Sequence, residues 1–161
     1  MRVIDSLLSE YAESHQTKLN IAIHYICVPL IFFSLIGLLA SIPMPEVITS
    51  ALPNTLLPYA HFGTVVIILG LFYYLRLSFV LFIGMVVFSA IVLFFINAIA
   101  QIDIAPLWLI MLIIFVIAWI GQFIGHNHEG KKPSFLKDLQ FLMIGPAWTM
   151  SHLFEALKIK F

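Results

Sequence analysis

The stretch Trp119–Pro133 reads WIGQFIGHNHEGKKP and joins a strongly apolar segment to a charged loop. If the apolar part is a helix, Gln122, His126, His128 and Glu129 lie within about two helical turns. Ionisable side chains within a long apolar helix are costly and usually functional, and the cost is smaller at the end of the helix. We therefore expect a metal site at this junction, at the mouth of a helical bundle.

The composition is that of a membrane protein. Of the 161 residues, 62% are hydrophobic and only 10% are charged, whereas soluble domains usually carry about 25% charged residues. A chain with so few charges cannot keep a soluble surface polar. Its formal net charge is zero, which gives no indication of nucleic-acid binding. We predict an all-α integral membrane bundle that forms a single domain over residues 1–161.

Long uncharged intervals predict where the chain crosses the bilayer. The intervals 19–45, 47–75, 77–102 and 104–128 carry no Asp, Glu, Lys or Arg, and each can hold the roughly 20 residues of a membrane-spanning helix. Arg76 leaves room for only a tight hairpin between the second and third. The chain is therefore expected to span the membrane four times, at residues 21–42, 59–75, 77–100 and 106–125.

Both ends of the chain are expected to lie at the membrane surface. Residues 3–14 place apolar side chains at helical spacing, which indicates an amphipathic surface helix. A further uncharged interval, 139–154, contains Gly145 and Pro146. Its length favours an interfacial or re-entrant helix, and a tilted fifth span is the alternative.

The distribution of basic residues predicts the orientation. With four spans, all eight Lys and Arg residues fall on one side, because the loops 43–58 and 101–105 contain none. Basic residues favour the cytoplasmic side. Both termini are therefore expected in the cytoplasm, with the chain in a bacterial inner membrane or the endoplasmic reticulum.

This topology gathers most of the histidines at one membrane surface. His61 lies at the far side and is expected to be a capping or interfacial residue. Histidines without cysteine partners suit metals such as iron, zinc or copper. The predicted metal ligands are His15, His24, His126 and His152, with His128 as a weaker candidate.

Helical geometry limits how these histidines can combine. His15 lies nine residues before His24, so the two share a site only if the chain bends between them. His126 and His128 point away from each other on a helix and converge only in an extended segment. One of this pair is therefore expected to be a bystander, and we predict that it is His128.

Polar neighbours accompany the histidines at helical spacing. Asn20 lies one turn before His24, and Gln122 lies one turn before His126. If the helix continues, Glu129 lies on the same helical face as Gln122 and His126. Otherwise it caps the helix or pairs with a nearby lysine. We predict that Asn20, Gln122 and Glu129 take part in the chemistry.

Two motifs together resemble a known family. The first, H-x4-N-x3-H-x4-P, is formed by His15, Asn20, His24 and Pro29. The second, Q-F-I-G-H at residues 122–126, is followed by Glu129, Pro133 and, further on, Pro146. In this order they resemble the Mpo-type family, named for the metabolism of phytosphingosine to odd-numbered fatty acids.

The resemblance implies an Fe(II)-dependent dioxygenase that uses O2 to remove one carbon from long-chain 2-hydroxy fatty acids. It implies His15, His24 and His126 as iron ligands. The carboxylate and hydroxyl of such a substrate can chelate one metal while its tail lies between apolar helices in the lipid bilayer. The alternative is a non-catalytic or transport membrane protein with a structural metal site. A transporter should carry polar residues through the membrane middle, where Ser89 and Asn97 are the main candidates.

Overall fold

The computed structural model describes residues 2–130 and 142–160, and this part of the chain contains helices and no strands. The predicted all-α class is confirmed. Seven α-helices and one short 3-10 helix follow one another in the described residues. In chain order they are α1 (Val3–Ala12), α2 (Lys18–Ala40), α3 (Glu46–Thr49), η1 (Leu57–Tyr59), α4 (Phe62–Leu77), α5 (Phe79–Ala100), α6 (Leu107–Glu129) and α8 (Ile144–Ala156).

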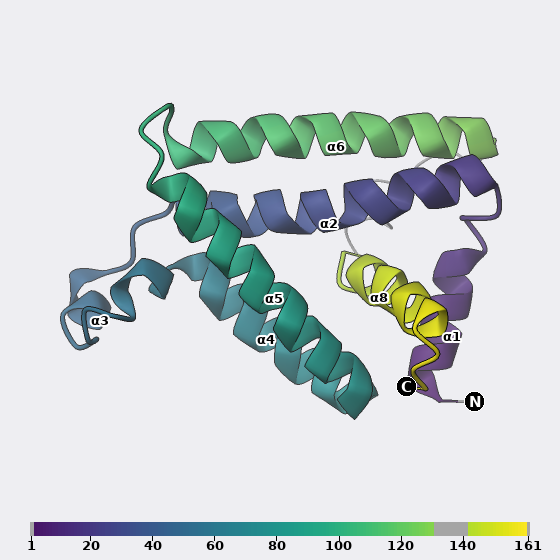
Figure 1. The fold of residues 1–161 in the computed structure, drawn as a ribbon, viewed down its shortest axis with the longest axis horizontal. Helices are drawn as coiled ribbons and strands as arrows, with labels where there is room; N and C mark the ends of the chain where they lie inside the picture. The colour runs from purple at the N-terminus through teal and green to yellow at the C-terminus, as the bar shows by residue number, and fades with distance from the viewer. Residues whose placement is uncertain (1, 131–141, 161) are drawn as a thin grey trace.

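The helices form two pairs that diverge from one end of the molecule. Helices α2 and α6 lie side by side, and the α4–α5 hairpin slants away from them (Figure 1). Helix α8 contacts α2 and α5 in the space between the pairs, and α1 packs against α8. The first turns of α2, the end of α6, and helices α1 and α8 therefore meet in one region.

Three of the described helices, α2, α5 and α6, are long and apolar enough to cross a membrane. Helix α4 is apolar and has 16 residues, and it begins three residues after the start of the second predicted span and ends two residues after its end. The later start has a local cause: residues 57–59 form η1, and His61 caps α4 by accepting a hydrogen bond from the Thr64 backbone N–H at 3.2 Å. The capping role predicted for His61 is confirmed.

The tight hairpin predicted at Arg76 is confirmed. Helix α4 ends at Leu77 and α5 begins at Phe79. The single linking residue, Ser78, has extended backbone angles (φ −164°, ψ 132°), and its hydroxyl accepts a hydrogen bond from the Leu81 backbone N–H at 3.4 Å. This cap starts α5 immediately after the turn.

The helix at the fourth predicted span is longer than that span. The span was expected at residues 106–125, and α6 runs from Leu107 to Glu129. Gly130 adopts a left-handed conformation (φ 71°) at the C-cap, which is the usual way for a helix to end. Gly125 therefore lies inside the helix, and His126, His128 and Glu129 are all helical.

The amphipathic helix expected at residues 3–14 is present as α1. It buries Ile4 and Tyr11 against the region around α8. At its start the Arg2 guanidinium donates to Asp5 at 2.8 Å and lowers the pKa of that carboxyl. The C-terminal helix α8 has 13 residues, which is short for a bilayer span.

Close packing of α2 on α6 depends on two glycines. A Cβ at Gly121 would lie 2.6 Å from Cys27 Sγ, and one at Gly125 would overlap the Asn20 amide oxygen. Small residues at such contacts allow apolar helices to approach closely. The glycines therefore bring the first turns of α2 against the last turns of α6.

Candidate metal centre

Three histidines converge where α1, α2 and α6 meet. His15 lies in the turn before α2, His24 in the second turn of α2, and His126 in the last turn of α6. All three are buried, with exposed fractions of 5%, 0% and 4%. Their ring centroids are 4.1 Å (His15–His24), 5.1 Å (His15–His126) and 4.9 Å (His24–His126) apart.

The ring nitrogens are close enough to share an ion. One nitrogen from each ring lies within 4.8 Å of the other two. Because metal–nitrogen bonds are about 2.0–2.1 Å long, these separations are near those of ligands on one ion. We call His15, His24 and His126 the imidazole cluster.

Main-chain carbonyls set the tautomer of two cluster rings. Nδ1 of His15 lies 2.6 Å from the Tyr11 carbonyl oxygen, and Nδ1 of His24 lies 2.9 Å from that of Asn20. A carbonyl only accepts, so each Nδ1 carries the proton and donates it. Nε2 then carries the lone pair in both rings. Metal-binding histidines are usually held in this way.

The chemistry of the donor set fits a metal ion. Nε2 of His24 is fully buried and has no hydrogen-bond partner among the described residues. A buried polar atom left without a partner costs about 1–3 kcal/mol, and a bound cation would remove that cost. Imidazole donors suit iron, zinc, copper or nickel. The group of metal-binding side chains found in the described residues contains no carboxylate.

The bend required to unite His15 with His24 is present. Helix α1 ends at Ala12 and α2 begins at Lys18, and the intervening turn folds His15 back over the start of α2. The ring of His15 stacks on Tyr11 at a centroid distance of 4.3 Å and an interplanar angle of 13°. This stacking fixes the ring against α1.

Glu129 fastens this turn to α6. Its carboxylate accepts hydrogen bonds from the backbone N–H groups of Gln16 and Thr17, both at 3.0 Å, from the Thr17 hydroxyl at 2.7 Å, and from the Asn20 amide at 3.2 Å. The charge thus lies at the N-terminus of α2, where backbone N–H groups lack helical partners. We call these contacts the Glu129 latch.

The other two polar residues predicted for the site are buried beside the cluster. Asn20 is 0% exposed, and its amide also donates to the Ser14 carbonyl at 3.2 Å. Gln122 is 5% exposed. Together with Tyr11 and Trp119 it lines a cavity of about 20 Å³, which is large enough for about one water molecule.

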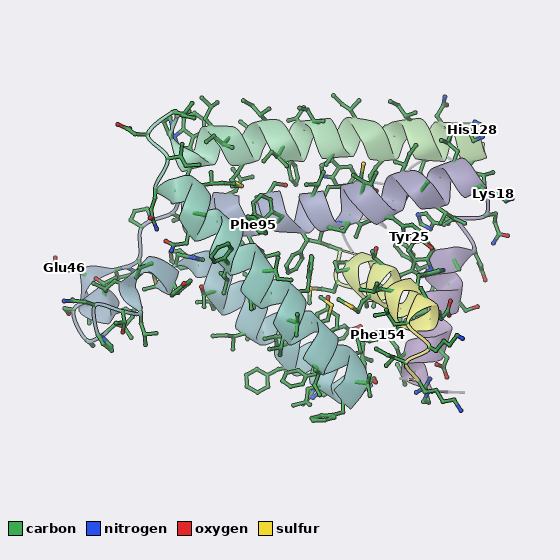
Figure 2. The ribbon with its side chains drawn as sticks, viewed as in Figure 1. Lys18, Tyr25, Glu46, Phe95, His128 and Phe154 are labelled. Atoms are coloured by element: carbon green, nitrogen blue, oxygen red, sulfur yellow. The ribbon has the colours of Figure 1, made fainter. Side chains whose placement is uncertain are left out.

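The structure does not bring His128 or His152 into the cluster. His128 is exposed at the outer end of α6 (Figure 2). His152 lies on α8, where its Nδ1 donates to the Trp148 carbonyl at 2.9 Å. The Trp148 ring contacts both His152 and His15, at centroid distances of 4.3 Å and 5.5 Å.

Two residues that contact the imidazole cluster were not predicted from the sequence. Tyr11 supplies both a stacking ring and a carbonyl to His15, and Trp148 forms an aromatic wall beside that histidine. For Tyr11 a signal existed, because it precedes His15 by four residues. Trp148 gave no signal, since nothing in the pattern showed which way α8 faces.

Comparison with known proteins identifies the family. A family model described as 2-hydroxy-palmitic acid dioxygenase Mpo1-like matches residues 1–157. The chain belongs to the Mpo1-like family. The resemblance inferred from the two motifs is therefore confirmed. No curated protein and no solved structure matched the chain.

The two motifs of this Mpo1-like chain lie next to each other in space. His15, Asn20 and His24 of the first meet Gln122 and His126 of the second across the α2–α6 contact. Of the two prolines that follow the second motif, Pro133 lies outside the described residues and Pro146 is buried in the first turn of α8. The family name implies dioxygenase activity, and the cluster is a possible three-histidine metal site.

Proposed function

We propose that this chain is a membrane-embedded, Fe(II)-dependent dioxygenase that shortens 2-hydroxy fatty acids by one carbon with O2. The observation that carries the proposal is the convergence of three buried imidazoles in a chain of the Mpo1-like family. His15, His24 and His126 would hold the iron. When bound, iron would supply a site at which O2 and the chelating carboxylate and hydroxyl of the substrate meet.

The surrounding residues orient the histidine side chains and position the turn that carries His15. Carbonyls of Tyr11 and Asn20 orient two of the imidazoles, and the Glu129 latch keeps the turn carrying His15 against α6. Tyr11 and Trp148 flank His15 with aromatic surface. Such a lining excludes water from the cluster, which strengthens electrostatic interactions inside it.

We also propose that the chain crosses the bilayer four times, with α4 as the shortest span and both termini in the cytoplasm. The start of α2, the tip of the α4–α5 hairpin and the end of α6 point to the same side of the molecule (Figure 1). Large apolar side chains are exposed on the outer faces of α5 and α6, as lipid contact requires; they include Phe94, Phe95, Ile117 and Ile124.

The deciding experiment combines metal analysis with turnover. Protein purified without oxygen and loaded with Fe(II) should consume O2 with 2-hydroxypalmitic acid and yield the C15 acid, detected by mass spectrometry. Palmitic acid, which lacks the hydroxyl, should give neither O2 uptake nor product. Tight metal binding without turnover of any 2-hydroxy acid would support the structural metal site instead.

A further inference from the structure

A groove of about 590 Å³ lies between α2, α5 and α8. Tyr25 and Pro29 of α2 form one wall, Phe88 of α5 closes one end, and residues of α8 from Pro146 to Ala156 form the other wall. We refer to it as the α8 groove.

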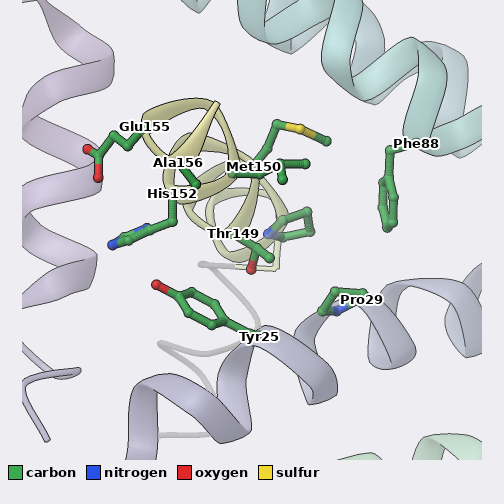
Figure 3. Close-up of a pocket in the computed structure, with 10 residues that line it drawn as sticks. Tyr25, Pro29, Phe88, Thr149, Met150, His152, Glu155 and Ala156 are labelled. Carbon is green, nitrogen blue, oxygen red and sulfur yellow. The ribbon is translucent and has the colours of Figure 1, made fainter. Parts of the chain in front are cut away.

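The two ends of the α8 groove differ in chemistry. At one end the Tyr25 hydroxyl and the His152 imidazole point toward each other, with Glu155 nearby, whereas Phe88 and Pro29 face each other at the other end (Figure 3). Among the described residues that line the groove, Glu155 is the only Asp, Glu, Lys or Arg. A hollow of this kind suits an amphiphile with a long apolar tail.

The polar end is also the end nearest the imidazole cluster. Tyr25 directly follows His24 on α2, and its ring lies 5.6 Å from that of Trp148. The same indole contacts His152 at 4.3 Å and His15 at 5.5 Å. One aromatic side chain therefore contacts residues of the groove and a member of the imidazole cluster.

We propose that the α8 groove binds the alkyl tail of the 2-hydroxy fatty acid. The head lies at the Trp148 end and the tail runs from Tyr25 and His152 toward Phe88. This inference rests on the proposed function, because it assigns a place to that reaction's substrate. The rim residues Tyr25 and Leu153 are 39% and 50% exposed, so the groove opens on the outer surface, where a tail dissolved in the bilayer can enter.

The test narrows the groove and compares substrates by length. Thr149→Phe places a ring among the lining residues. Val87→Phe adds the same ring at a residue of α5 that is 56% exposed and does not line the groove. Each methylene that leaves an apolar site lowers affinity roughly fourfold. Thr149→Phe should therefore raise KM for 2-hydroxypalmitic acid about tenfold more than KM for 2-hydroxyhexanoic acid. Val87→Phe should not separate the two acids.

A second variant and a binding measurement distinguish a narrowed groove from misfolding of the Thr149→Phe protein. Ala156→Phe alters the groove at an exposed position at the end of α8 and should show the same preference for the short acid. Metal-free Thr149→Phe protein in nanodiscs should bind radiolabelled 2-hydroxypalmitic acid about tenfold more weakly than wild type. That binding is measured without turnover, so it tests the groove even if the proposed reaction fails.

Three results would overturn the proposal. The first is an equal change in KM for both acids in the Thr149→Phe and Ala156→Phe variants. The second is unchanged binding of 2-hydroxypalmitic acid to the metal-free variants. The third is loss of a co-purified phospholipid in Thr149→Phe, detected by mass spectrometry, with fatty-acid KM unaltered; this would assign the groove to a membrane lipid. If the wild-type protein binds 2-hydroxypalmitic acid but does not turn it over, that result would count against the proposed reaction alone.

Discussion

At the scale of single residues, His126 and His128 provide a matched pair for testing the metal site. They lie two positions apart on the same turn of α6, yet His126 is buried in the cluster and His128 is exposed. His126→Ala should lower the affinity for Fe(II) by more than about 100-fold, because even outer partners of metal ligands are worth 10–100-fold. His128→Ala should leave it unchanged. Metal content after dialysis against a chelator measures both, and full metal retention in His126→Ala would contradict the site.

A second prediction for a single residue concerns the hydrogen bonds that the Glu129 carboxylate accepts. Glu129→Ala removes the acceptor for the Gln16 and Thr17 backbone N–H groups, and losing such a cap usually costs about 1 kcal/mol. Because the same turn carries His15, Fe(II) affinity should fall about 10–100-fold. Glu129→Gln retains an acceptor oxygen and should recover part of this affinity. A chelator competition assay measures the three proteins.

The role of Glu129 in turnover follows from the same pair of variants. If Glu129 acts by positioning, saturating Fe(II) should restore kcat in Glu129→Gln to near the wild-type value. A kcat that stays more than about 100-fold low at full metal occupancy would instead assign the carboxylate to the chemical step.

At the scale of helices, the α2–α6 contact brings His24 and His126 together. Gly125→Ala would drive a Cβ into the Asn20 amide oxygen, and such overpacking typically costs about 1–3 kcal/mol. We expect a lower thermal midpoint together with weaker Fe(II) binding, because α2 carries His24 and α6 carries His126. Ile124→Ala, at a position that is 57% exposed on the same helix, is the control and should change neither. Unaltered metal binding in Gly125→Ala would show that the cluster tolerates separation of the two helices.

Helical spacing explains which parts of the site the sequence could predict. His24 and His126 each lie one turn from a polar neighbour at the end of an apolar helix, so their shared level follows from the topology. The sequence did not predict the bend that brings His15 to His24; it showed only that the two can share a site if the chain bends between them. The hydrogen-bond partners of Glu129 could not be predicted, because the position of a residue on one face of α6 does not show which other segment of the chain packs against that face. Trp148 was missed for the same reason, since the direction of α8 depends on tertiary packing.

The length of helices was less predictable than their existence. Uncharged intervals located α2, α4, α5 and α6, because charges are excluded from apolar spans. They did not show that η1 and the His61 cap delay the start of α4 to Phe62, or that Gly130 rather than Gly125 ends α6. Helix ends depend on caps and local turns, which hydropathy does not describe.

At the scale of the whole molecule, the number of membrane crossings determines whether the cluster and both termini share one side. The chain has a single cysteine, Cys27, and it is buried, so a Cys27→Ser background allows labelling of introduced cysteines. Ser9→Cys and Lys158→Cys should react with an impermeant maleimide from one side of sealed vesicles. Ser50→Cys, directly after α3, and Ile104→Cys, between α5 and α6, should react only from the other side. If α4 fails to cross, Ser9 and Lys158 will be labelled from opposite sides, and the four-span arrangement will be wrong.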